Sequence, residues 1–155
     1  MQFILKALLA AIGIAIVAGI LTTSGEVGTQ NGCDGAQERQ ALQQAEPKDW
    51  GSLYRLFKQF GGCDDGAIGE GFSEDVAQLF SKQWAHLDTL GRLTTTDKAF
   101  EHFVLRHIDA TLSGDELKAI GNNSRFHCPS GEKRLCQLVR VRVQSSLDEM
   151  RRYSK

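Results

Sequence analysis

The sequence predicts an all-α fold: a small irregular helical bundle of five to six helices with two disulfides, preceded by an N-terminal signal or anchor helix. Three observations support this class. Apolar side chains recur at helical spacing, most strongly in residues 96–112. Residues 7–21 form an unbroken apolar run, and four cysteines follow it. The alternation that strands require is confined to residues 138–143, and a strand there would have no partner.

The first residues predict export. Residues 1–6 carry one lysine, and the apolar run after them has no polar face, which is typical of a secretory signal. Gly19 and Ser24 mark small-residue cleavage sites, yet residues 3–21 are nearly the length of about 20 residues that a membrane span needs. We therefore expect a periplasmic or extracellular domain, or one tethered to the inner membrane. The chain divides into a signal peptide or membrane anchor (residues 1–24), a polar linker with a short helix (25–46) and an α-helical domain (47–155).

The cysteines predict two disulfides, since an even number in an exported chain is typical of a disulfide framework. No two of them have the Cys-x-x-Cys spacing of a zinc site. Cys128 and Cys136 flank a short loop that contains Pro129, so we favour their pairing among the three that are possible. By elimination, Cys33 then pairs with Cys63.

The first half of the domain is expected to form three helices. Residues 36–45 predict a short, exposed helix, and residues 49–60 predict a stronger one with aromatic residues on one face. Gly61 and Gly62 are expected to end the second helix through a left-handed conformation. A loop or single helical turn follows, after which Ser73 is expected to cap a helix over residues 74–84.

The second half is organised around residues 96–112, which follow a connector over residues 85–95. Their predicted apolar stripe consists of Phe100, Phe103, Val104, His107, Ile108 and Thr111. Ser113 and Glu116 fit the capping box of a further helix, expected over residues 115–121 and ended by a polar break. Residues 134–152 are expected to form the terminal helix.

Charge excludes one class of function. Removal of the leader takes away Lys6, which leaves 17 of the 18 basic residues against 19 acidic ones, a net charge of −2. General nucleic-acid binding requires a basic surface, so we do not expect it.

Acidic residues are unusually concentrated before and at the start of the helix predicted over residues 74–84. They are Asp64, Asp65, Glu70, Glu74 and Asp75, and no basic residue follows until Lys82. Capping and the helix dipole account for them structurally. Their spacing does not fit a calcium-binding EF-hand, and the glycines among them do not fit a phosphate-binding loop. The functional alternative is a docking surface for a partner with a basic surface.

Motifs for catalysis, metals and cofactors are absent from the sequence. The four histidines show no metal-binding spacing, and there is no nucleophile motif of the Gly-x-Ser-x-Gly type. His107 is the one catalytic candidate. A histidine on an apolar stripe is most simply a core residue with one hydrogen-bond partner, but proximity to Asp64 or Asp65 would create a proton-transfer pair. We expect no metal and no cofactor.

The leading functional hypothesis is an exported envelope protein that binds another protein through its acidic loop, as an inhibitor or toxin-immunity factor. Its resemblance to small exported immunity proteins is in general build alone. Two alternatives stay open. One is a small hydrolase that uses carboxylates and His107, and the other is a membrane-anchored scaffold or assembly factor.

Overall fold

The computed structural model describes residues 33–153, so the predicted leader and the first part of the linker lie outside the described residues. Seven α-helices and three 3-10 turns form the regular structure of this part, which contains no strand. The all-α class is therefore confirmed, with seven helices in place of five to six. The helices are α1 (Gly35–Ala41), α2 (Trp50–Phe60), α3 (Gly66–Lys82), α4 (Leu87–Thr96), α5 (Lys98–Arg106), α6 (Gly114–Phe126) and α7 (Lys133–Tyr153). The turns are η1 (Gly61–Cys63), η2 (Trp84–His86) and η3 (Ser130–Glu132).

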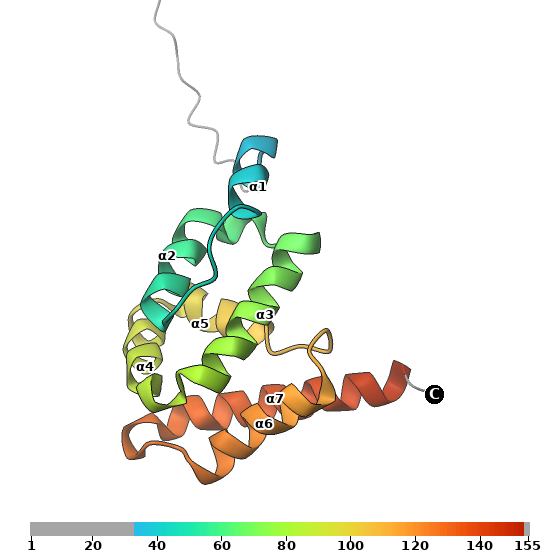
Figure 1. Cartoon of the computed structure of the whole chain (residues 1–155). Coiled ribbons are helices and arrows are strands. Elements are labelled where there is room, and N and C mark those ends of the chain that lie inside the picture. The colour runs from blue at the N-terminus through green and yellow to red at the C-terminus, as the bar shows by residue number, and fades with distance from the viewer. Residues whose placement is uncertain (1–32, 154–155) are drawn as a thin grey trace, which may run out of the picture.

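The helices are arranged between two unlike ends. At one end α6 and α7 pack along each other, and at the opposite end α1 stands over the end of α2 and the turn η1 (Figure 1). Helices α2 to α5 lie between these ends and enclose most of the core. Among the helices of residues 33–153, none combines the length and the hydropathy needed to cross a bilayer.

Aromatic rings form the centre of the core. The ring of Phe103 lies 4.9 Å from the rings of Phe57 and Phe72 and 4.5 Å from that of His107, measured between centroids. Phe103 and Phe72 are 2% and 5% exposed, and burial of such a side chain stabilises the fold by about 1.5–3 kcal/mol. The apolar faces predicted for residues 49–60 and 96–112 therefore meet in this cluster.

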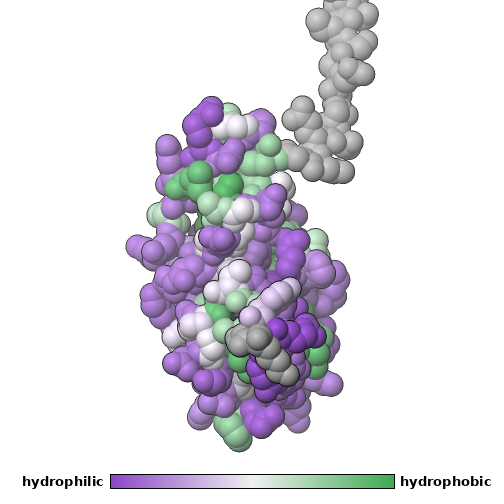
Figure 2. All heavy atoms as spheres, turned by 90° about the vertical axis from the view of Figure 1, so that its right-hand side faces the viewer, coloured by the Kyte–Doolittle hydropathy of each residue, from purple (hydrophilic) through white to green (hydrophobic). Residues whose placement is uncertain are grey.

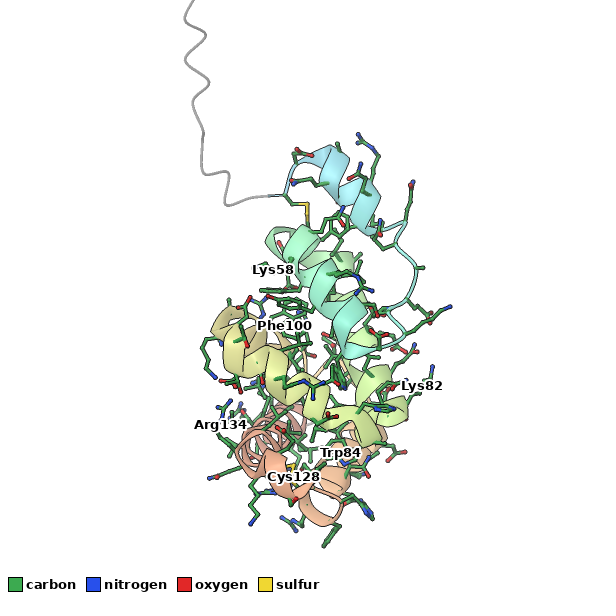
Figure 3. All side chains as sticks on the ribbon, turned by 90° about the vertical axis from the view of Figure 1, so that its left-hand side faces the viewer. Lys58, Lys82, Trp84, Phe100, Cys128 and Arg134 are labelled. Atoms are coloured by element: carbon green, nitrogen blue, oxygen red, sulfur yellow. A yellow bond between two sulfur atoms is a disulfide. The ribbon has the colours of Figure 1, made fainter. Side chains whose placement is uncertain are left out.

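Both predicted disulfides are confirmed. Cys33–Cys63 joins the residue before α1 to η1, and Cys128–Cys136 closes the connection between α6 and α7. Figure 3 shows the first bond below α1, and it shows Trp84 close to Cys128. The Trp84 indole N–H donates to the carbonyl of His127 at 2.9 Å, which fastens this loop to η2. On the chain-entropy model, closures of 30 and 8 residues stabilise the fold by about 3.5 and 2.5 kcal/mol.

The start of α3 differs from the prediction. The helix begins at Gly66, capped by the side chain of Asp65, so Ser73 is a buried residue within the helix and not its cap. Glycines lower intrinsic helix propensity, but burial of Phe72 against the core overrides it here. The predicted left-handed conformation at the end of α2 is also wrong for Gly61, which is helical with φ −61°. Among the described residues, the glycine with a positive φ is Gly66 (50°), at the start of α3.

Three further helix boundaries were misjudged. The predicted connector over residues 85–95 is mostly helical, because Leu87 and Leu90 are fully buried on one face of α4. Helix α5 stops before His107, where the Asp109 carboxylate accepts the backbone N–H of Thr111 and forms a local turn. Helix α6 continues through the predicted polar break to Phe126, while its predicted capping box is confirmed.

Candidate functional site

The end of α5 and the middle of α3 form a buried polar network. His107 caps the C-terminus of α5, and Ser73 faces it from α3. The Nε2 atom of His107 lies 3.0 Å from Oδ2 of Asp64, and its Nδ1 atom lies 3.0 Å from Oγ of Ser73. The guanidinium of Arg106 donates to the same oxygen of Asp64. The structure thus brings His107 to Asp64, the contact that a proton-transfer pair requires.

The hydroxyl of Ser73 is in reach of more acceptors than it can serve. Besides His107, it lies 3.0 Å from Oδ2 of Asp109 and 3.2 Å from the carbonyl of Gly69. One hydroxyl carries one hydrogen, so these contacts compete. Asp64, just before α3, can lie this close to the helix because Gly69 has no side chain. A Cβ at Gly69 would lie 3.2 Å from Oδ1 of Asp64.

Burial, and to a smaller extent the positive charge of Arg106, lower the pKa of His107 to about 4 against the opposing effect of the Asp109 carboxylate. The imidazole is therefore neutral at pH 7 and carries one N–H. We assign this N–H to Nε2, since it faces the Asp64 carboxylate, which leaves Nδ1 to accept from Ser73.

A serine, a histidine and an aspartate in a hydrogen-bonded line are the components of an activated nucleophile. A nucleophile must also meet its substrate, yet Ser73 and His107 are only 2% and 3% exposed. Five pockets found on residues 33–153 are lined by neither of them, nor by Asp64. In this conformation the network ties the loop before α3 to the end of α5 and is closed to a substrate.

The structure separates the five predicted acidic residues into distinct surroundings. The Asp64 side chain is 6% exposed and belongs to the buried network, and Asp65 caps α3. Glu70 points to solvent from α3, outside the pockets described here. Glu74 and Asp75 line a pocket. The five acidic residues are therefore close in sequence but do not form a single acidic face.

The pocket that Glu74 and Asp75 line lies between α1, α2 and α3 and has a volume of about 240 Å³. Its walls are largely apolar, and a third carboxylate comes from Glu46, in the segment between α1 and α2. Neither lysine nor arginine lines it. The apolar wall residues are Ala41, Leu42, Leu56, Phe60, Ala67, Ile68 and Phe72.

Asp75 is the carboxylate that the pocket affects most. Burial, together with the smaller effect of the negative charges of Glu46 and Glu74, raises its pKa to about 6. Each cause disfavours the ionised form, so a cation that entered this pocket would be favoured by all three carboxylates. This arrangement is chemically suited to binding a basic group beside an apolar one.

A second pocket, of about 280 Å³, adjoins the first and shares Leu42, Ala67 and Ile68 with it. The Cys33–Cys63 disulfide lines it, together with two further acids, Glu38 and Asp65. Figure 2 shows apolar residues gathered on this side of the molecule, just below the end that carries α1. We call the two adjoining pockets the α1 groove.

Sequence reasoning missed several members of both sites. Glu46 joins the pocket from a separate segment, and only its position after a predicted helix was visible in the sequence. Ser73 was predicted to cap a helix, so its place in the buried network was not expected, and Asp109 was not among the predicted site residues. Within residues 33–153, no group of three or more histidine, cysteine, aspartate or glutamate side chains is arranged to hold a metal ion.

Comparison of the chain with protein-family models, curated proteins and solved structures gives no match.

Proposed function

We propose that this is an exported binding protein that uses the acidic pocket between α1, α2 and α3 to take a basic and apolar part of a partner protein. The observation that carries the proposal is the convergence of Glu46, Glu74 and Asp75 on an apolar pocket that no basic residue lines. A carboxylate whose pKa is raised by burial and by like charge gains most from a cationic partner.

Two features support export. Both disulfides join cysteines of the folded domain, and stable disulfides are typical of oxidising compartments. The charged start and apolar run of the first residues are those of a secretory signal. A protein that masks a basic surface of an enzyme would act as an inhibitor or immunity factor, which is the biological role we favour.

Co-purification with matched variants tests the proposal. Full-length protein with a C-terminal tag is isolated from its native cells as wild type, as Glu74→Lys/Asp75→Lys and as Glu70→Lys. We expect the pocket variant to lose a partner that the Glu70→Lys control retains, because Glu70 lies on the same helix but outside the pocket. Retention of every partner by the pocket variant would refute the proposal.

A hydrolase is the second candidate, and it rests on the line from Ser73 through His107 to Asp64. A fluorophosphonate probe reacts with activated serine hydroxyls and separates the two functions. Because Ser73 is shielded, we expect no labelling of the folded protein. Labelling at Ser73 that disappears in His107→Gln would favour the enzyme.

A further inference from the structure

The α1 helix is joined to the body of the protein mainly through its disulfide. None of its residues is buried. The side-chain hydrogen bonds of residues 34–44 stay within that segment. Ala41 packs against the core at its edge, and Cys33 is bonded to Cys63. A helix of seven residues is far below the length of about 12–15 that is marginally stable alone in water, so the disulfide holds this wall in place.

Acidic side chains lie at both ends of the α1 groove. Glu38 and Asp65 lie at the disulfide end, and Glu46, Glu74 and Asp75 lie at the other end. Between them, Leu42, Ala67 and Ile68 are common to both pockets and form an apolar middle. No lysine or arginine lines either pocket, so the groove presents two anionic sites on either side of an apolar one.

The division of the α1 groove into two pockets favours an extended segment over a single compact ligand. The pockets have volumes of about 240 and 280 Å³, and acidic side chains line each of them. Building on the function proposed above, we propose that the α1 groove binds a short segment of the partner in which an apolar side chain stands between two basic ones, and that it does so only while Cys33–Cys63 is intact.

The chemistry of release is a thiol–disulfide exchange with an external dithiol. Cys33 is half-buried and Cys63 is 5% exposed, so the dithiol's thiolate attacks the sulfur of Cys33 and forms a mixed disulfide. Cys63 leaves as a thiolate and takes a proton. The second thiol of the reductant then displaces Cys33, so two electrons pass from the dithiol to the protein and the reductant becomes a disulfide. With the bond cut, α1 detaches and removes Leu42 and Glu38 from the groove.

Defined peptides test the occupant. Short fluorescein-labelled peptides carry Leu, Ile or Phe between two lysines at varied spacing, and matched peptides carry glutamates or a central serine instead. Fluorescence polarisation on full-length oxidised protein is expected to show binding of the lysine set alone. Glu74→Gln/Asp75→Asn and Glu38→Gln/Asp65→Asn should each weaken it about tenfold or more, whereas Glu70→Gln should not. Asparagine keeps the cap at position 65.

Cysteine variants test the role of the disulfide. Cys33→Ser/Cys63→Ser, and wild type treated with dithiothreitol, should lose peptide binding. Hydrogen exchange of the α1 amides should rise while that of α3 and α5 stays slow. Cys128→Ser/Cys136→Ser removes the distant disulfide and should retain binding. Protection of α1 after proven reduction, or undiminished binding by the Cys33→Ser/Cys63→Ser protein, would overturn the proposed redox control.

The outcomes also separate this inference from the function on which it rests. If no basic–apolar–basic peptide binds while the pocket variant still loses its partner in cells, the proposed segment is wrong and the binding function stands. If the pocket variant keeps all of its partners, the proposed function itself fails. If the acidic substitutions leave peptide binding unchanged, the α1 groove is not the site.

Discussion

Acidification is expected to destabilise the fold through His107, and the size of the effect follows from its burial. The difference between an ordinary pKa of 6.5 and a folded-state pKa of about 4 corresponds to about 3 kcal/mol. Between these values the unfolded chain binds more protons than the folded one. This contribution to stability is therefore complete above pH 6.5 and is lost as the pH falls toward 4.

Asp75 contributes with the opposite sign. Its pKa rises from 3.8 to about 6 on folding, so the folded state binds more protons in this window. Stability therefore falls as the pH rises from 3.8 through 6, by at most about 3 kcal/mol. The two effects nearly cancel in the wild type. The combined contribution of His107 and Asp75 to the free energy of unfolding is therefore expected to be almost constant between pH 4 and 6.

Variants separate the two contributions. Urea denaturation followed by tryptophan fluorescence is performed across pH 4 to 7 on wild type, Asp75→Asn, His107→Gln and the double variant. We expect Asp75→Asn to lose about 3 kcal/mol on acidification and His107→Gln to gain stability instead. The comparison concerns slopes against pH, so a constant loss of stability in either variant does not affect it.

A specific result would refute this reasoning. If the imidazole carried both protons, it would donate from Nε2 to Asp64 and from Nδ1 to Ser73. The Ser73 hydroxyl would then donate to Asp109, so all three hydrogen bonds would form at once. If NMR titration of the folded protein places the pKa of His107 above 6.5, the two carboxylates outweigh burial. The slope of the Asp75→Asn protein would then be reversed.

Three further substitutions have distinct expected effects in the same urea assay. Ser73→Ala should cost about 1–3 kcal/mol, because it leaves Nδ1 of His107 buried without a partner, and Ser73→Thr, which keeps the hydroxyl, should cost less. Trp50→Phe should change stability by less than about 1 kcal/mol, because loss of packing is offset by removal of a buried indole N–H that has no hydrogen-bond partner. Asp97→Ala should cost about 1–2 kcal/mol, since its side chain caps α5 and accepts from Tyr54 at 3.1 Å, while Asp97→Asn should restore most of the cap.

The sequence predicted the parts of the fold that local physics determines. The helix over residues 49–60 and the cap at Ser113 are where periodicity and capping chemistry placed them. It misplaced the start of α3, because glycine propensity is a local signal and burial of Phe72 is a tertiary one. The same limit applies to α4, whose three leucines suit either a packed connector or a helix.

The candidate sites were predictable only in part, because both are assembled from separate segments. His107 and Asp64 were paired as a hypothesis, but Ser73 enters the network only because α3 begins early enough to turn it inward. The acidic pocket depends on Glu46, which the chain brings to Asp75 after passing α1. The spacing of these residues in the sequence does not indicate that they lie close together in the fold.

The connectivity of the disulfides bears on how the protein reaches its native state. Each cysteine is bonded to its immediate neighbour in chain order, the first to the second and the third to the fourth. A chain that enters an oxidising compartment from its N-terminus presents Cys33 and Cys63 before the other two, and the shorter loop closes most readily of all. Oxidation in order of emergence therefore yields the correct bonds directly, and maturation would not depend on an isomerase to reshuffle them.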